Sequence, residues 1–258
     1  MANFQKYWIA YLTIARKEIR RFARIWVQTI VPPVITVALY FIIFGNLIGQ
    51  RIGEMDGIKY IDYIMPGLIM MAVITSSYAN VVSSFYSAKF SRHLEEMLVS
   101  PIPNVVILLG FLTGGITRGL FVGSAVTVVA LMFTEFSVYN PWIIISVALL
   151  TATLFSLAGL INGIYAQSFD DVSLIPTFVL APLTYLGGIF YSINLLPEFW
   201  QKVSLINPIL YMINSFRYGF LGVSDISLIT AFTVIVIFII ILFIVCMMLL
   251  QRGIGIRN

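Results

Sequence analysis

Long apolar stretches separated by short polar ones make up almost the whole chain. A helix needs about 20 consecutive, mostly apolar residues to cross a bilayer, and six stretches reach that length. Because backbone polar groups in lipid must pair within their own segment, each stretch is predicted to be a helix. The pattern therefore predicts an all-α integral membrane protein that forms one domain over residues 1–258. The six predicted spans are residues 25–49, 62–86, 105–133, 142–165, 173–193 and 229–250.

The first 24 residues differ from the spans because they are amphipathic. Their apolar residues recur every three or four positions, which is the spacing of one helix face, and basic residues occupy the other faces. This pattern predicts a helix over residues 1–24 that lies in the headgroup plane, held by aromatic residues and anionic lipid. The alternative is a basic flank that only retains and orients the first span. The apolar stripe comprises Phe4, Trp8, Tyr11, Ala15, Ile19, Phe22 and Trp26, and the bases assigned to the membrane interface are Arg16, Lys17, Arg20, Arg21 and Arg24.

A short charged stretch, SAKFSRHLEEMLVSPIP at residues 87–103, interrupts the apolar pattern. Its apolar residues fall at i, i+4, i+7 and i+8, so they are predicted to share one face of a helix over residues 88–100. Such a helix either caps the protein at the membrane interface or contacts another protein. Mixed-sign charge favours a protein over an anionic membrane, but on physical grounds both readings stay open. The apolar face comprises Phe90, Leu94, Met97 and Leu98, and the other faces carry Lys89, Arg92, His93, Glu95 and Glu96.

Residues 194–222, between the fifth and sixth predicted spans, contain a second short element. The apolar run from Pro208 to Leu221 has only fourteen residues and is interrupted by Arg217. It is too short to cross a bilayer, so a re-entrant or interfacial segment is predicted. A buried arginine is costly in lipid, so Arg217 is expected to face water, headgroups or a carboxylate such as Glu198. A direct substrate contact is the sharper alternative. The residues assigned to this segment are Asn207, Pro208, Tyr211 and Arg217.

Composition and charge support a membrane protein and give it an orientation. Hydrophobic residues make up 60% of the chain, charged residues 10%, and the mean hydropathy is +1.00. Soluble domains have roughly 25% charged residues, so that class is excluded. Cytoplasmic loops are enriched in Lys and Arg, and ten of these residues against four place both termini and residues 87–103 in the cytoplasm. The ten are the arm residues Lys6, Arg16, Lys17, Arg20, Arg21 and Arg24 with Lys89, Arg92, Arg252 and Arg257; the four are Arg51, Lys59, Lys202 and Arg217.

Small and polar residues inside the spans predict how the helices pack. Gly115, Gly119 and Gly123 recur every four residues in the third span, which predicts a close helix contact there. A polar stripe in the second span either lines a pathway or, more commonly, bonds neighbouring helices; its members are Ser76, Asn80, Ser83 and Ser87. Arg118 lies in the third span, where it is expected to snorkel to the inner interface in preference to acting as a functional charge inside the membrane.

The chemistry of an enzyme is missing from this sequence. His93 is the sole histidine, so neither a serine–histidine dyad in the membrane nor an HExxH metal site is expected. Asp170 and Asp171 are adjacent and would point about 100° apart on a helix, which makes a poor metal pair. No lysine follows a glycine, so the chain lacks a phosphate-binding P-loop. No catalytic residue, metal site, cofactor or nucleic-acid partner is therefore predicted for this chain.

The order of these features resembles the type-2 ABC transporter (ABC-2) permeases, and within them the YadH-type permeases. Permeases of this family have a cytoplasmic elbow helix, six spans, a coupling helix after the second span and a membrane-dipping segment before the sixth. The matching stretches are WVQTIVPPVITVALYFIIFGNLIG, FSRHLEEMLVSPIP and LPEFWQKVSLINPILYMINSFRYGFLG. The likeness covers essentially the whole chain.

This resemblance implies a multi-pass inner-membrane exporter subunit that works as a homodimer. It also implies a dimer of separate ATPase subunits that bind ATP and magnesium and contact residues 90–98. The alternative is an ion-coupled secondary transporter or a channel. Such carriers place ionisable residues near the bilayer midplane, where only Arg118 is a candidate. The transported substrate is not predicted.

Overall fold

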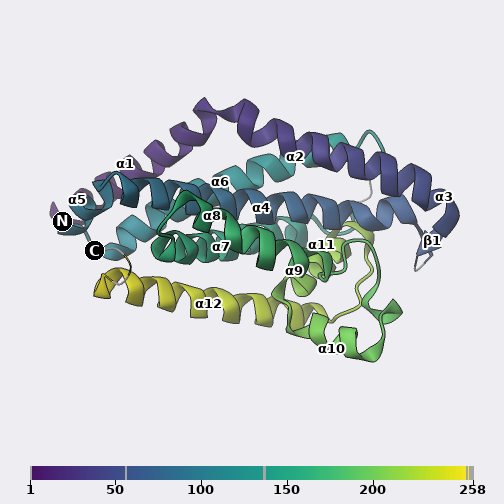
Figure 1. Ribbon diagram of the computed structural model, residues 1–258. Coiled ribbons are helices and arrows are strands. Elements are labelled where there is room, and N and C mark those ends of the chain that lie inside the picture. The colour runs from purple at the N-terminus through teal and green to yellow at the C-terminus, as the bar shows by residue number, and fades with distance from the viewer. Residues whose placement is uncertain (1, 56, 136–137, 254, 256–258) are drawn as a thin grey trace.

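The computed structural model describes residues 2–55, 57–135, 138–253 and 255, and these are almost entirely helical. Arg257, one of the bases used to predict the orientation, lies outside the described residues. Long helices run beside one another along the molecule (Figure 1). The start of helix α1, the end of helix α12 and the short helix α5 lie at one end of the molecule. The β1–β2 hairpin and helix α10 lie at the opposite end.

The elements follow the predicted order closely. Segments of wider π-helix or tighter 3₁₀ helix are labelled η. In chain order the elements are α1 (Ala2–Arg24), α2 (Trp26–Tyr40), η1 (Phe41–Ile48), α3 (Gly49–Ile52), β1 (Glu54–Met55), β2 (Ile58–Lys59), α4 (Tyr60–Phe90), α5 (His93–Val99), α6 (Asn104–Ala130), α7 (Pro141–Tyr165), α8 (Phe169–Ile175), η2 (Pro176–Leu180), α9 (Ala181–Tyr185), η3 (Ile193–Leu195), α10 (Glu198–Ile206), α11 (Pro208–Leu221) and α12 (Leu228–Arg252).

Five of the predicted spans are confirmed as helices long and apolar enough to cross a membrane. Within the described part of the chain these helices cover Trp26–Ile52, Tyr60–Phe90, Asn104–Ala130, Pro141–Tyr165 and Leu228–Arg252. The predicted span 173–193 differs in its bounds, since the helical segment formed by α8, η2 and α9 runs from Phe169 to Tyr185. Its chain then turns through Gly188 at a φ of +77°, a conformation that suits glycine. As a crossing segment it stays a prediction.

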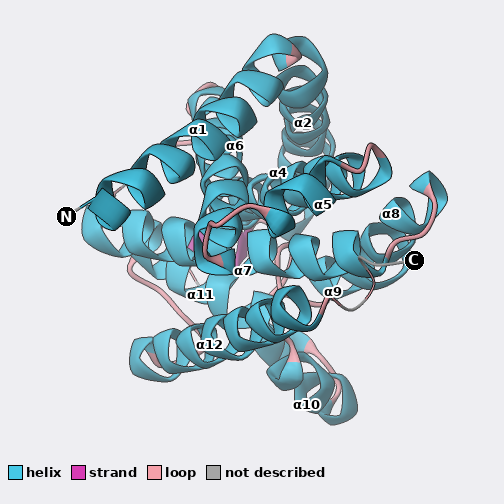
Figure 2. Ribbon diagram, turned by 90° about the vertical axis from the view of Figure 1, so that its left-hand side faces the viewer, coloured by secondary structure: helices cyan, strands magenta, loops and turns pink. Residues whose placement is uncertain are grey.

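Helix α4 forms the centre of the bundle, and α6 and α7 pack along it (Figure 2). Glycines on α6 permit the close approach predicted from their spacing. A Cβ atom on Gly119 would overlap the Ser77 hydroxyl of α4, and one on Gly123 would lie 2.6 Å from Val73. Bare glycine faces of this kind let helix backbones approach closely in lipid, where packing contributes most of the association energy.

The α10–α11 pair forms the predicted short segment before the last span. Helix α11 is buried along most of its fourteen residues, and it packs among α4, α7 and α12. Asn207 begins it: its side-chain carbonyl accepts from the Ile209 amide, and its Nδ2 donates to the Leu183 carbonyl at 2.6 Å. The Tyr211 hydroxyl donates to the Leu205 carbonyl at 2.7 Å, which ties α11 to α10. The run is therefore a helix of fourteen residues, and its place as a re-entrant or interfacial segment stays a prediction.

Replacing Gly119 by alanine tests the α4–α6 contact. The added methyl group meets Ser77 in a packed interface, and overpacking of this kind typically costs about 1–3 kcal/mol. We expect Gly119→Ala to lower the thermal unfolding midpoint of the purified protein in detergent. The double variant Gly119→Ala/Ser77→Ala removes the overlapping hydroxyl and should recover most of the loss. A double variant as unstable as the single one would contradict the assigned contact.

Candidate functional site

The charged stretch after α4 forms a shorter helix than its sequence predicts. Helix α4 continues to Phe90, and α5 begins only at His93, so the prediction of one helix over residues 88–100 is wrong. The break lies at Arg92, the one described residue other than glycine with a positive φ, at +60°. The left-handed conformation turns the chain sharply and ends the helical ladder. As a result Phe90 belongs to α4 and does not share a face with Leu94.

Helix α5 turns its apolar side toward its own chain. Leu94 is fully buried in a cluster with Ile14 of α1 and Ile107 of α6, and Met97 and Leu98 are half-buried against the same cluster. The surface that α5 leaves free is polar, apart from Phe90 before it and Val99 at its end. Its exposed members are Phe90, Arg92, His93, Glu95, Glu96 and Val99. A partner at this end would therefore meet mainly the charged face.

The end of α4 is bonded to the turn between α7 and α8. The Lys89 ammonium donates to the carbonyls of Ile164 and Ala166, at 2.7 and 2.8 Å. These carbonyls lie at the end of α7, where the helix dipole favours a positive charge. The Tyr86 hydroxyl donates to the Gln167 carbonyl at 3.0 Å. These bonds hold the last turns of α4, which lead into α5, against the end of α7.

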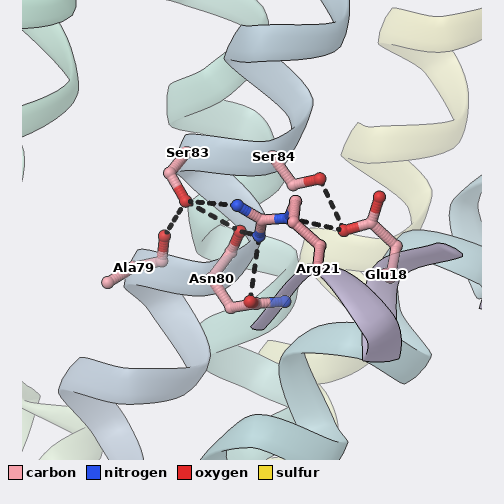
Figure 3. Close-up of polar contacts among 6 residues, drawn as sticks. All are labelled: Glu18, Arg21, Ala79, Asn80, Ser83 and Ser84. Atoms are coloured by element: carbon pink, nitrogen blue, oxygen red, sulfur yellow. Dashed lines mark hydrogen bonds and ion pairs between the residues drawn. The ribbon is translucent and has the colours of Figure 1, made fainter. Parts of the chain in front are cut away.

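A buried polar cluster joins α1 to the central helix (Figure 3). Glu18 is fully buried, and its Oε2 atom lies 3.4 Å from Arg21 Nε and accepts a short hydrogen bond from the Ser84 hydroxyl. Arg21 Nη2 donates to the backbone carbonyl and the side-chain oxygen of Asn80, at 2.8 and 2.9 Å, and Nη1 donates to the Ser83 hydroxyl at 3.4 Å. The cluster thus fastens α1 to α4 through charge-assisted bonds, which are stronger than neutral ones.

The position of α1 follows from glycines on α6. A Cβ on Gly110 would overlap Ile14, and one on Gly114 would lie 2.5 Å from the Glu18 side chain. Because these glycines leave room, α1 lies directly on α6 and carries Glu18 and Arg21 to α4. The Tyr11 hydroxyl adds a hydrogen bond to Thr113 at 2.9 Å. The helix predicted over residues 1–24 is confirmed, and its placement in the headgroup plane stays a prediction.

The cluster changes the expected role of one basic residue of the arm. Arg21 reaches into the protein, whereas Arg16, Lys17, Arg20 and Arg24 are exposed, and their contact with headgroups stays a prediction. The polar stripe of α4 is largely covered: Ser76 and Asn80 are buried, and Ser83 is half-buried. Bonding between helices, the commoner of the two expected roles, accounts for Asn80 and Ser83.

Sequence reasoning did not single out Glu18. A signal was present, because Glu18 lies four residues from both Ile14 and Phe22, on the side of the arm that is buried. A carboxylate on the apolar side of an otherwise basic helix indicates a partner inside the protein, since a buried charge is costly without one.

At the opposite end of the molecule, Arg217 is buried and does not face water or Glu198 as expected. Its guanidinium lies 4.0 Å from the centre of the Tyr63 ring, and Nη2 donates to the Gly188 carbonyl at 2.6 Å. Cation–π stacking and a hydrogen bond to a backbone carbonyl together offset the free-energy cost of burying this charge. It borders a small cavity of about 260 Å³ lined by Tyr63, Asn194, Arg217, Val223, Ser224 and Asp225. Across the described residues, no group of histidine, cysteine or acidic side chains could hold a metal ion.

Comparison with known proteins gives a consistent result. The sequence profile of the family described as "ABC-2 type transporter" matches residues 9–221. The inner membrane transport permease YadH of Escherichia coli K12 is 60% identical over 253 residues, which cover 98% of each chain. Nodulation protein J of Rhizobium leguminosarum bv. viciae is 24% identical over 219 residues, which cover 83% of each chain.

Removing Arg21 tests the cluster. Arg21→Ala leaves the buried Glu18 carboxylate without its cation, and breaking a buried pair costs about 3–5 kcal/mol. We expect a lower thermal unfolding midpoint and faster proteolysis of α1. Arg20→Ala, which removes an exposed base from the same helix, should change stability by less than about 0.5 kcal/mol. Adding Glu18→Gln to Arg21→Ala should recover part of the loss; equal effects of Arg20→Ala and Arg21→Ala would argue against the cluster.

Two variants of Arg92 isolate the backbone conformation at the α4–α5 turn. Both Arg92→Gly and Arg92→Val remove the charge, but only glycine adopts a positive φ without strain. A left-handed residue with a side chain costs roughly 1–2 kcal/mol, and a β-branched one more. We expect proteolysis at this turn to be slower in Arg92→Gly than in Arg92→Val. Indistinguishable cleavage rates would show that the turn does not require this φ.

Proposed function

The chain belongs to the ABC-2 type transporter family, and from this premise we propose that it is the membrane-spanning subunit of an ATP-binding-cassette exporter. The family profile over residues 9–221 supports the assignment, as does the length over which the YadH permease is similar. That relative is named an inner membrane protein, which supports the cytoplasmic (inner) membrane as the location. ATP hydrolysis by a separate subunit would then power the transport of a substrate through this one.

The proposed topology has six crossings with both termini in the cytoplasm. Five crossings are the long apolar helices, and the sixth is the segment of α8, η2 and α9 over residues 169–185. The excess of Lys and Arg supports the orientation. The start of α1, the end of α12 and the whole of α5 share one end of the molecule, as this topology requires (Figure 1).

We assign ATP and magnesium binding to a separate dimer of ATPase subunits, which dock on α5. The observation that carries this assignment is the bonded position of α5. Leu94 fixes it to α1 and α6, and Lys89 joins the preceding turn to the end of α7. A force applied to the exposed charged face therefore reaches several spans at once. Coupling requires that the closed ATPase favour one of two arrangements of these spans.

A second copy of the chain would complete the translocation path. An apolar groove of about 340 Å³ lies between α2, α4 and α9, bordered by Pro33, Tyr40, Met71 and Tyr185. Beside it, Thr75 of α4 is exposed. Along the same side of α4, Ala79 and Ser83 are half-buried. This side of α4 is where a pathway between two copies would run. Of the three residues predicted to line it, Ser83 alone is partly exposed, in addition to its bond to Arg21, whereas Ser76 and Asn80 are buried.

Reversing the charges of Glu95 and Glu96 tests the docking face. We expect Glu95→Lys/Glu96→Lys to insert normally, yet to lose the ATPase subunit and the ATP hydrolysis that co-purify with the unaltered chain. The matched control is Glu54→Lys, which reverses an exposed charge in the hairpin at the other end of the molecule. The measurements are ATPase activity and subunit content of complexes purified from native membranes. Full coupling in the double reversal, or ion-driven transport by the purified chain alone, would refute the proposal.

A further inference from the structure

Arg118, near the middle of α6, has no acceptor within the part of the protein that the structure describes. Its side chain is half-buried and its Nε atom is fully buried without a hydrogen-bond partner. The nearby carboxylate of Glu18 is bonded to Arg21 and Ser84 instead. A charged group in a membrane-crossing helix normally pairs with a counter-charge or reaches a hydrated region, because isolation in lipid is costly.

The surroundings of Arg118 are electrically positive. The charge of Arg21 lies close enough to repel it, and the last turn of α1 also carries Arg24. Glu18 is the buried acid at this point, and it offsets only the charge of Arg21. One positive charge therefore remains uncompensated at the α1–α6 contact, so the site is complementary to an anion.

An apolar groove runs beside this charge. It has a volume of about 580 Å³ and no polar lining, and it lies between α1, the start of α2 and α6. On α6 the groove is bordered by Thr117, which directly precedes Arg118, and by Phe121, which lies about one turn after it. The facing wall is formed by Phe22, Ala23 and Trp26 at the bend between α1 and α2. The groove and the charge together are complementary to an amphipathic ligand, with an anionic group beside Arg118 and an apolar part in the groove.

The bases of α1 mark the depth of this site in the membrane. Five of them, Lys6, Arg16, Lys17, Arg20 and Arg24, are exposed, and exposed bases are stable at the headgroup level but not in hydrocarbon. The headgroup placement predicted for α1 would put Arg118, which lies on α6 beside the end of α1, at the boundary between headgroups and acyl chains on the α5 side of the membrane.

We propose that this contact binds an anionic glycerophospholipid from the leaflet on the α5 side. Arg118 binds the lipid phosphate, and one acyl chain fills the groove lined by Phe22, Ala23, Trp26 and Phe121. Basic pockets between helices at this level of a membrane are suited to anionic headgroups. A carboxylate from a second copy of the chain would neutralise Arg118 but would leave the apolar groove empty. The bound lipid would hold the α1–α2 bend against α6.

The test compares phosphatidylglycerol with phosphatidylcholine on the purified full-length protein. We expect phosphatidylglycerol, added in mixed micelles, to raise the thermal unfolding midpoint more than phosphatidylcholine does, and to be retained by the protein in native mass spectra. Arg118→Gln should weaken the apparent affinity for phosphatidylglycerol by about tenfold or more, which corresponds to the loss of one charge-assisted hydrogen bond. Lys202→Gln, which removes an exposed base of α10 at the opposite end of the molecule, should leave that affinity unchanged.

A second variant keeps the charge and fills the groove. Ala23→Leu should weaken retention of phosphatidylglycerol while leaving Arg118 in place, so the proposal can be tested even where Arg118→Gln fails to fold. Equal lipid dependence in the unaltered protein, Arg118→Gln and Ala23→Leu would overturn the proposal. The proposal would also be overturned if glycerol phosphate reproduced the full stabilisation, because the site would then bind a free anion. Loss of the dimer in Arg118→Gln with unchanged lipid retention would overturn it as well, because Arg118 would then contact a second copy of the chain.

Discussion

Three helices approach the glycine-bearing faces of α6 closely, and the positions of the polar cluster and of α5 follow from this packing. Gly119 and Gly123 admit α4, Gly115 admits Ser156 of α7, and Gly110 admits α1. In lipid there is no hydrophobic force between helices, so this contact must come from close packing and interhelical bonds. A side chain at any of these positions would move a neighbouring helix and, with it, the groups that the helix carries.

The polar cluster and the α5 turn both derive their geometry from that packing. Arg21 reaches Asn80 only because α1 lies directly on α6, and Leu94 finds a buried site only where α1, α4 and α6 meet. The apolar side of α5 is consequently used within the chain. The side of α5 that stays exposed is mainly charged, and charged surfaces contribute specificity and association rate to an interaction more than affinity.

Buried charges at the two ends of the bundle are compensated in different ways. Glu18 and Arg21 form a pair completed by Ser84 and Asn80, whereas Arg217 lies over an aromatic ring and bonds to a backbone carbonyl. The first arrangement joins the arm to the central helix, and the second joins α11 to the central helix and to the loop after α9. Each therefore connects a helix outside the five long apolar helices to α4.

The pattern of apolar and polar residues was enough to predict the class of protein, five of the long helices, the amphipathic arm and the half-length segment near the last span. Length and periodicity suffice for these features, because the bilayer imposes fixed lengths on the helices that cross it. The family was also recognisable from the order of the elements. By contrast, the break at Arg92 depends on one backbone dihedral angle, and no spacing of apolar residues encodes it.

Which polar groups meet follows from the three-dimensional arrangement of the helices and could not be predicted from the sequence. Arg21 and its exposed neighbour Arg20 are chemically identical in the sequence, and the partners of Arg217 come from α4 and from the loop at Gly188. Contacts between residues far apart in the chain depend on how the helices rotate and cross. Those angles are set by packing over the whole interface, so a residue's own neighbours in the sequence do not contain them.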